Sequence, residues 1–336
     1  MAGLGSRLVS RWFSIALALC LVAPGIGAAH TSDANRGRVS DWVTLGTGGG
    51  PVIQVERSQP ANALLVGEEA YLFDVGEGSV RQLKAAGIPL ANVKAVFVSH
   101  LHLDHVGGLA ALLSSRWVVG MRTPVTVIGP HGIKDMIEGL IESRGPIEIA
   151  TAVGSAGSAS FKSTFVVDEI DPDTKAPKQV FADKAVRVIT VQNDHFHDAD
   201  GSDYSGSARS YSFRIEAPDR SIVYSGDTGP SEALTLLAKD ADLLVSEVID
   251  REAADRALDA LAHLSPEQRS SLNLHMQLNH LSAAEIAEMA NRAQVKAIVL
   301  THLVPGKDGE PDLAGYLRGI EEFRGPVKIA NDLDRF

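Results

Sequence analysis

Residues Ser99–Gly108 carry the sequence SHLHLDHVGG, in which His100, His102, Asp104 and His105 lie within six positions. Imidazole nitrogen and carboxylate oxygen are ligands that Zn²⁺ takes at about 2.0–2.2 Å. A packed apolar core does not require such side chains, and the alternative is a polar loop whose histidines face solvent. So dense a cluster favours a metal site over that alternative.

The residues on either side of this stretch predict a strand, a loop and a helix. Val93–Val98 is rich in β-branched residues and predicts a short buried strand that ends just before His100. Val106–Leu113 predicts the start of a helix, and its two glycines allow the backbone to approach a neighbour closely. The candidate ligands therefore lie in a loop at the carboxyl end of a strand.

Residues 1–29 have the features of a secretory signal peptide. Arg7 and Arg11 give a basic start, Trp12–Val22 is apolar, and Gly27–Ala29 offers small residues for cleavage. The alternative is an uncleaved N-terminal anchor, although the apolar run is shorter than the roughly 20 residues that span a bilayer. We expect a periplasmic or secreted protein, free of the membrane after cleavage, in which residues 30–336 form a single domain.

The composition excludes some classes of site and partner. Cys20 is the only cysteine and lies in the predicted signal, so the mature chain has neither disulfides nor thiolate ligands. Without Arg7 and Arg11, 29 basic residues stand against 42 acidic ones, a net charge of −13. Nucleic-acid binding depends on Lys and Arg side chains that neutralise phosphates. We therefore expect that nucleic acid is not a partner; the sequence does not predict an oligomeric state.

Four further candidate site residues lie at the ends of predicted strands. They are His195 after 185–191, Asp227 after 220–225, Glu247 at the end of 242–247, and His302 at the end of 295–302. Histidines scattered through a core would not keep this position. The pattern predicts one site that is built from strand termini.

A loosely patterned segment separates the two halves of the chain. Residues 150–163 are rich in Ala, Gly and Ser, which predicts a loop or insertion rather than packed structure. Residues 168–177 are acidic and contain proline, which places them on the surface. The segment could form either a substrate-specific arm or a surface loop without a role in substrate binding.

The site motifs resemble those of the metallo-β-lactamase superfamily. The H-x-H-x-D-H motif at His100–His105, the later His195, Gly226–Thr228 and Thr301–His302 follow one another in that superfamily's order. The resemblance implies a fold of the α/β (α+β) class, a four-layer αββα sandwich of two pseudo-symmetric halves. Its metal site would lie at one edge of the two sheets.

Three further features look like one branch of that superfamily. Leu72–Gly78, Glu247 and Asn279–Ser282 are similar to motifs of the branch that contains ribonuclease Z and arylsulfatases. Carried over to this chain, the resemblance implies that Glu247 and His280 act as a pair. The alternative for His280 is a surface residue that flanks a helix.

The resemblance implies two divalent metal ions. His100, His102 and His195 would bind one ion, Asp104, His105 and His302 the other, and Asp227 would bridge both. We expect Zn²⁺, although Mn, Fe or Co also accept such ligands. His197 is an alternative to His195 as the third histidine, because it lies two residues further on the same face of an extended strand.

The implied activity is hydrolysis of a phosphodiester or sulfate ester. A hydroxide that bridges the metals would attack phosphorus or sulfur, and His280, oriented by Glu247, would assist the leaving group. Asp104 is counted as a catalytic residue as well as a ligand. Asp74 is expected to order the histidine loop from outside the ligand set, whereas His131, His263 and His275 are expected to be ordinary surface or core histidines.

Two departures from the ribonuclease pattern bear on the substrate. Leu303–Gly306 stands where those nucleases continue with serine, arginine and an aromatic residue, and residues 145–184 lack the basic character of a tRNA-clasping arm. We therefore expect a small-molecule ester as substrate. The alternatives are a lactone, thioester or β-lactam hydrolase on the same site, or a non-catalytic metal-binding interaction protein.

Overall fold

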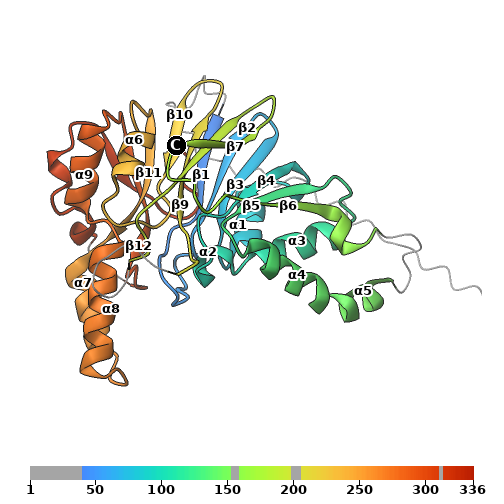
Figure 1. Cartoon of the computed structure of the whole chain (residues 1–336), viewed down its shortest axis with the longest axis horizontal. Coiled ribbons are helices and arrows are strands. Elements are labelled where there is room, and N and C mark those ends of the chain that lie inside the picture. Colours follow the sequence, from blue (N-terminus) through green and yellow to red (C-terminus); the bar gives the residue numbers. More distant parts are fainter. Residues whose placement is uncertain (1–39, 153–158, 198–205, 310–312) are drawn as a thin grey trace, which may run out of the picture. The chain divides into compact units, whose positions relative to one another are not determined.

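The computed structural model describes residues 40–152, 159–197, 206–309 and 313–336, all of which belong to one structural unit (Figure 1). The predicted signal peptide lies outside the described residues, so that prediction and the single-domain prediction for 30–336 are not tested. Within the described ranges, no helix has the length and apolar character needed to cross a membrane.

The first sheet has six strands in the order β1-β2-β3-β4-β5-β6. Strands β1 to β3 pair antiparallel and β3 to β6 pair parallel. Their bounds are β1 (Ser40–Gly46), β2 (Ala61–Val66), β3 (Glu69–Val75), β4 (Val93–Phe97), β5 (Val125–Gly129) and β6 (Phe165–Glu169).

The second sheet has seven strands in the order β13-β12-β11-β10-β9-β8-β7. Strands β7 to β10 pair antiparallel and β10 to β13 pair parallel. Their bounds are β7 (Lys178–Ala182), β8 (Arg187–Gln192), β9 (Tyr211–Glu216), β10 (Ser221–Tyr224), β11 (Leu243–Ile249), β12 (Ile298–Val304) and β13 (Val327–Ile329).

Helices cover the outer face of each sheet, which confirms the predicted αββα sandwich. Figure 1 shows α1, α3 and α4 beside the first sheet and α6 and α9 beside the second, while the antiparallel pair α7 and α8 extends away from the sheets. The α-helices are α1 (Ser79–Ala85), α2 (Leu103–Val106), α3 (Leu109–Val118), α4 (Ile133–Ser143), α5 (Gly145–Ala152), α6 (Glu232–Leu237), α7 (Arg251–Asp259), α8 (Pro266–Asn279) and α9 (Ala283–Arg292). Short 3-10 turns cover Leu90–Asn92, Phe161–Thr164, Ala314–Leu317 and Ile320–Glu322.

The alternation of side chains along each strand builds two kinds of core. In β3, Leu72 faces the helices of the first half, whereas Tyr71 and Phe73 face the opposite sheet. Between the sheets, the ring of Phe73 on β3 lies 5.9 Å from that of Phe213 on β9 and 6.3 Å from that of Tyr224 on β10. This aromatic layer fixes the two sheets against each other and therefore sets the distance between the strand ends that carry the site.

The segment predicted to be loose is partly ordered, so the prediction of a loop over 150–163 is wrong at both ends, since residues 150–152 belong to α5 and Phe161–Thr164 form a 3-10 turn. Phe161 is fully buried and its ring lies 5.9 Å from Trp117 and 5.1 Å from Phe165. Residues 165–169 form strand β6, which pairs with β5. Burial of two aromatic rings outweighs the small-residue composition around them. Residues 153–158 lie outside the described part, and whether the segment is a substrate arm stays a prediction.

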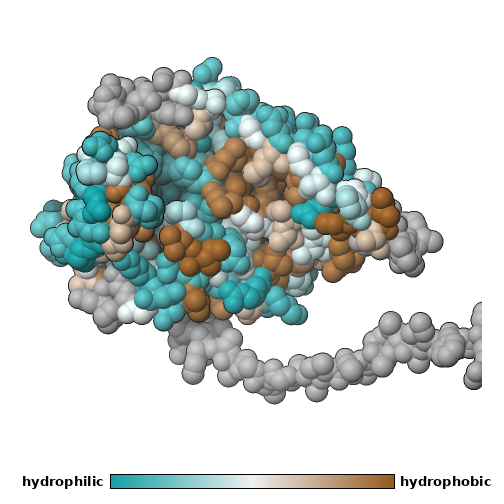
Figure 2. Space-filling view, turned by 90° about the horizontal axis from the view of Figure 1, so that it is seen from below, coloured by the Kyte–Doolittle hydropathy of each residue, from teal (hydrophilic) through white to brown (hydrophobic). Residues whose placement is uncertain are grey.

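The surface on the face shown in Figure 2 mixes hydrophilic side chains with separate hydrophobic patches. Among the most exposed apolar residues are Val52, Val55 and Leu103. Scattered exposed apolar side chains are ordinary on protein surfaces.

We expect the core between the sheets to dominate stability. Leu64 on β2 is fully buried in that layer, whereas Leu236 on α6 is 61% exposed. The substitution Leu64→Ala should lower the free energy of unfolding by about 2–5 kcal/mol, while the chemically identical Leu236→Ala should change it by less than about 0.5 kcal/mol. Urea titration followed by circular dichroism measures both, and equal losses in the two variants would contradict the described packing.

Candidate metal centre

The predicted site residues come together at one edge of the two sheets. The loop after β4 carries His100 and His102, the chain after β8 carries His195, and the chain after β10 carries Asp227. Strands β8 and β10 run in the same direction on either side of antiparallel β9, and β10 pairs parallel with β11 and β11 with β12. The carboxyl ends of these strands therefore meet at one edge of the second sheet.

His302 was predicted to be the last residue of a strand, but β12 continues to Val304. Thr301 pairs with Glu247 and Leu303 with Val248, so His302 is an extra residue in the strand, with a φ of 45°. A bulge of this kind re-aims a side chain, and strained backbone is common at functional sites. The imidazole is fully buried against the other site residues.

Three imidazole nitrogens converge in the first cluster. His102 Nδ1 lies 2.9 Å from His100 Nε2 and 3.2 Å from His195 Nε2, and all three ligand atoms lie within 4.8 Å of one another. Neutral imidazoles that point ring nitrogens at a common point have the arrangement of a metal ligand set. These are the three residues predicted for one ion.

A second cluster lies beside the first. Asp104 Oδ2 is 3.6 Å from His105 Nε2 and 3.5 Å from His302 Nε2. Asp227 Oδ2 lies 3.2 Å from His105 Nε2, 3.1 Å from His302 Nε2 and 3.9 Å from His100 Nε2. Asp227 therefore stands between the two clusters, where a bridging carboxylate is expected.

The structure distinguishes His195 from His197. His195 is fully buried in the first cluster, and its Nδ1 donates to the carbonyl of Asn279 at 2.9 Å, which leaves Nε2 facing His102. His197 instead directs Nδ1 to Asn279 Oδ1 at 2.6 Å. The geometry favours His195 as the third histidine, and its role as a ligand stays a prediction.

Asp74 holds the histidine loop from outside the two clusters, as the sequence predicted. Its Oδ1 accepts from the backbone N–H of Ser99 at 2.7 Å, and its Oδ2 accepts from Ser99 Oγ at 2.7 Å and lies 2.7 Å from His105 Nδ1. A carboxylate on Nδ1 fixes the tautomer of an imidazole and turns Nε2 toward a metal.

The glycine run after β1 contributes to the site in a way that the sequence analysis missed. The N–H of Gly50 donates to Asp104 Oδ2 at 3.0 Å. A Cβ added at Gly49 would lie 2.6 Å from His302 Nδ1, so only glycine leaves room for that ring. The run Gly48–Gly50, just after a strand, was the signal available in the sequence.

The second cluster is negatively charged and attracts cations. Burial opposes protonation of His105, but the charges of Asp227, Asp104 and Asp74 outweigh it and raise the pKa of His105 well above its ordinary value. Burial also acts to lower the pKa of His302, but Asp227 and Asp104 raise it to about 10. A divalent cation bound here would compensate the negative charges of these carboxylates.

The first cluster offers neutral ligands. Burial lowers the pKa of both His100 and His195 well below the ordinary value of histidine, so their ring nitrogens keep free lone pairs. Asp227 Oδ1 is also buried without a hydrogen-bond partner among the described residues. The donor set therefore fits two divalent ions, one for each cluster, with Asp227 between them.

Glu247 and His280 form the expected pair. His280 Nδ1 lies 2.7 Å from Glu247 Oε2, and the backbone N–H of Thr228 donates to Glu247 Oε1 at 2.8 Å. Burial acts to lower the pKa of His280, but the charge of Glu247 outweighs it and the pKa is raised. The His280 ring lies 5.2 Å from that of His195 and 6.0 Å from that of His302, so it faces both clusters.

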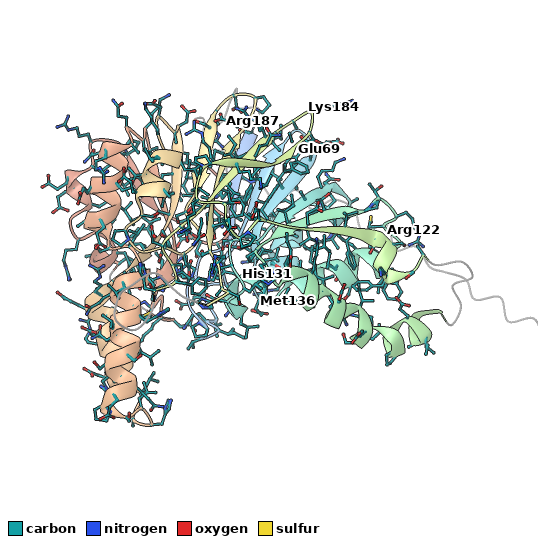
Figure 3. All side chains as sticks on the ribbon, in the orientation of Figure 1. Glu69, Arg122, His131, Met136, Lys184 and Arg187 are labelled. Atoms are coloured by element: carbon teal, nitrogen blue, oxygen red, sulfur yellow. The ribbon has the colours of Figure 1, made fainter. Side chains whose placement is uncertain are left out.

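The remaining histidines lie outside the ligand clusters. His131, labelled in Figure 3, stands exposed just before α4 with Glu169 at 3.5 Å, and His263 is exposed. His275 accepts from Asn279 Nδ2 at 2.6 Å. Their positions agree with the expectation of ordinary histidines, although Asn279 links His275 to the site's outer layer.

Comparisons with known proteins identify relatives of the chain. A family model described as Anti-Pycsar protein Apyc1 matches residues 41–294. Ribonuclease Z of Mycobacterium bovis (strain BCG / Pasteur 1173P2) is 29% identical over 294 residues, which cover 87% of this chain and 95% of the relative.

Solved structures share the fold. The metallo-β-lactamase fold protein YhfI from Bacillus subtilis superposes with a TM-score of 0.62 and 18% identity, over 88% of this chain and 99% of that one. The short form of human tRNase Z gives a TM-score of 0.61 and 21% identity, over 88% and 98% of the two chains.

The αββα sandwich and its histidine-aspartate edge define a protein of the metallo-β-lactamase superfamily, in the branch similar to ribonuclease Z. Within this superfamily, the family model that matches residues 41–294 identifies the family of the chain. The chain belongs to the Anti-Pycsar protein Apyc1 family.

The expectation of a small-molecule ester and no nucleic acid is wrong as it was made. The relatives include proteins named ribonuclease Z and tRNase Z, whose names denote RNA as a substrate. The net charge of the chain averages over the whole surface, so it does not report the charge at the place where a substrate binds. A metal centre supplies positive charge locally, where a phosphodiester would bind.

We expect metal content to depend on the bridging carboxylate. Purified wild-type protein should hold close to two metal equivalents by inductively coupled plasma mass spectrometry, and Asp227→Asn should lose at least one, because both clusters share this side chain. His263→Ala, an exposed histidine outside the clusters, is the matched control and should keep both. Wild-type protein without metal, or equal loss in the control, would overturn the assignment.

Proposed function

We propose that this chain is a metal-dependent phosphodiesterase whose site holds two divalent ions, with Zn²⁺ as the first expectation. The observation that carries the proposal is the buried Glu247–His280 pair, which faces both ligand clusters. A protein that only binds metal does not require a proton donor at that place. The non-catalytic alternative is therefore disfavoured.

The residues that would hold the ions are the two clusters and the carboxylate between them. His100, His102 and His195 would hold one ion, Asp104, His105 and His302 the other, and Asp227 would contact both. Bound divalent ions would supply Lewis-acid activation of water and of the phosphoryl oxygens. Asp104 would act through the ion it holds.

His280 would protonate the leaving oxygen of the ester. Its Nδ1 is held by Glu247, so Nε2 is the atom that can donate to the substrate. Burial acts to lower the pKa of His280, but the charge of Glu247 outweighs it and raises that pKa, which favours the protonated ring that can donate from Nε2. Thr228 fixes the carboxylate of Glu247 through its backbone N–H, and the carboxylate in turn fixes the orientation of the imidazole.

RNA is the substrate class that the relatives support. The chain is similar to ribonuclease Z along most of its length, and a structural neighbour is a tRNase. A cavity of about 300 Å³ lies beside Phe196, whose ring is 5.4 Å from that of His102, and its described lining combines Lys175 and Arg209 with Asp173 and Asp194. A nucleotide chain with one phosphodiester at the clusters could extend into this cavity.

No observation on the described residues specifically supports a sulfate ester, lactone, thioester or β-lactam as substrate. None of the relatives named above is an arylsulfatase, and no described contact favours sulfur over phosphorus. Lactones, thioesters and β-lactams remain alternatives only because the same activated water could attack carbon.

We expect His280→Ala to lower kcat for bis(p-nitrophenyl) phosphate and for a short synthetic RNA by about 10²–10⁴-fold, since a positioned general acid contributes about that much. Metal content should stay at the wild-type level, because His280 lies outside the two predicted ligand clusters.

His263→Ala is the matched control and should turn over both probes as the wild type does. Unchanged turnover in His280→Ala would remove the role assigned to this residue. Loss of metal from the same variant would instead make His280 a ligand. If a panel of esters showed only lactones or thioesters to be hydrolysed, the phosphodiesterase proposal would be wrong.

A further inference from the structure

The carboxylate of Asp74 is shared by both halves of the sandwich. Besides Ser99 and His105 from the first half, its Oδ2 accepts from the hydroxyl of Tyr224 at 2.8 Å. Tyr224 is the last residue of β10 in the second sheet, whereas Asp74 lies in β3 of the first. The hydrogen bond therefore crosses the interior of the sandwich immediately behind the metal clusters.

Packing fixes the place of the Tyr224 hydroxyl. The side chain is 1% exposed, and its ring lies 6.1 Å from that of Trp42 and 6.3 Å from that of Phe73. A ring held among aromatic neighbours has little freedom to move its oxygen. The position of the hydroxyl therefore depends on the distance between the sheets.

The Asp74 carboxylate, which accepts this hydrogen bond, is also held in one position. Asp74 is fully buried and has a φ of 58°, a left-handed conformation that a non-glycine residue keeps only when its surroundings hold it. Its two oxygens contact three polar groups of the histidine loop, and Tyr224 supplies the only partner that the described contacts give it from the second half. Without the phenol, one lone pair of a buried carboxylate would lose its donor.

We propose that Tyr224 is a positioning residue for the metal held by Asp104, His105 and His302. Through Asp74 it fixes the His105 ring with Nδ1 toward the carboxylate and Nε2 toward Asp227. The inference rests on the proposed function, since it assumes that the two clusters bind metal. The new element is that a residue of the second half of the sandwich, Tyr224, orients a metal-ligand candidate of the first half, His105.

The effect should be larger at one cluster than at the other. His105 contacts Asp74 directly, whereas the nearest link from Asp74 to the first cluster passes through Ser99 Oγ, which lies 3.0 Å from His100 Nδ1. Loss of the phenol should therefore loosen the ion at His105 more than the ion at His100. A hydroxyl that served only the stability of the core would affect neither ion.

The test compares two substitutions that each remove one phenolic oxygen from the same interior layer. Tyr224→Phe keeps the ring and deletes the donor to Asp74. Tyr71→Phe is the matched control, because the Tyr71 hydroxyl also bonds carboxylates, Asp183 at 2.6 Å and Glu69 at 2.9 Å, away from the clusters. Zinc affinity is measured by competition with a fluorescent chelator and fitted to two sites, with circular dichroism to confirm folding.

We expect Tyr224→Phe to weaken one of the two zinc equivalents by about 10–100-fold, the range seen when an outer partner of a metal ligand is removed. The other equivalent and both equivalents of Tyr71→Phe should stay within about threefold of the wild type. Wild-type affinities in Tyr224→Phe, or equal weakening in Tyr71→Phe, would overturn this inference alone. Wild-type protein that binds neither zinc nor manganese, iron or cobalt would overturn the proposed function with it.

Discussion

The structure depends on the meeting of two sheets at Asp227. This buried carboxylate lies within 3.9 Å of imidazole nitrogens from two separate segments of the chain, namely His100 and His105 in the first half and His302 in the second. Buried charges are costly unless they are compensated, and divalent ions held by these side chains would compensate the buried carboxylates. The aromatic layer around Phe73 keeps the two sheets at the spacing this convergence requires.

The sequence predicted the grouping of the site residues from local patterns, whereas it predicted the αββα fold through the resemblance to the metallo-β-lactamase superfamily. A strand that ends on a histidine or carboxylate places that side chain at a sheet edge, and the repetition of this pattern at His195, Asp227 and His302 predicted one site. The Glu247–His280 contact was also predicted, although only through the resemblance.

Other features could not be predicted because they depend on tertiary geometry. The bulge that turns His302 inward arises from the pairing register of β11 and β12, and the bond from Tyr224 to Asp74 joins residues 150 positions apart. The helical pair α7 and α8, inserted between Glu247 and His280, was missed although a signal existed. Ser265, Pro266 and Gln268 form a capping box with proline at the first helical position.

The central claim is that the strand ends hold two metal ions with Asp227 between them. Anomalous diffraction at the zinc absorption edge, from crystals of zinc-loaded protein, tests it most directly. The account predicts two peaks, one in contact with His100, His102 and His195 and the other with Asp104, His105 and His302. A single peak, or zinc bound away from these residues, would contradict it.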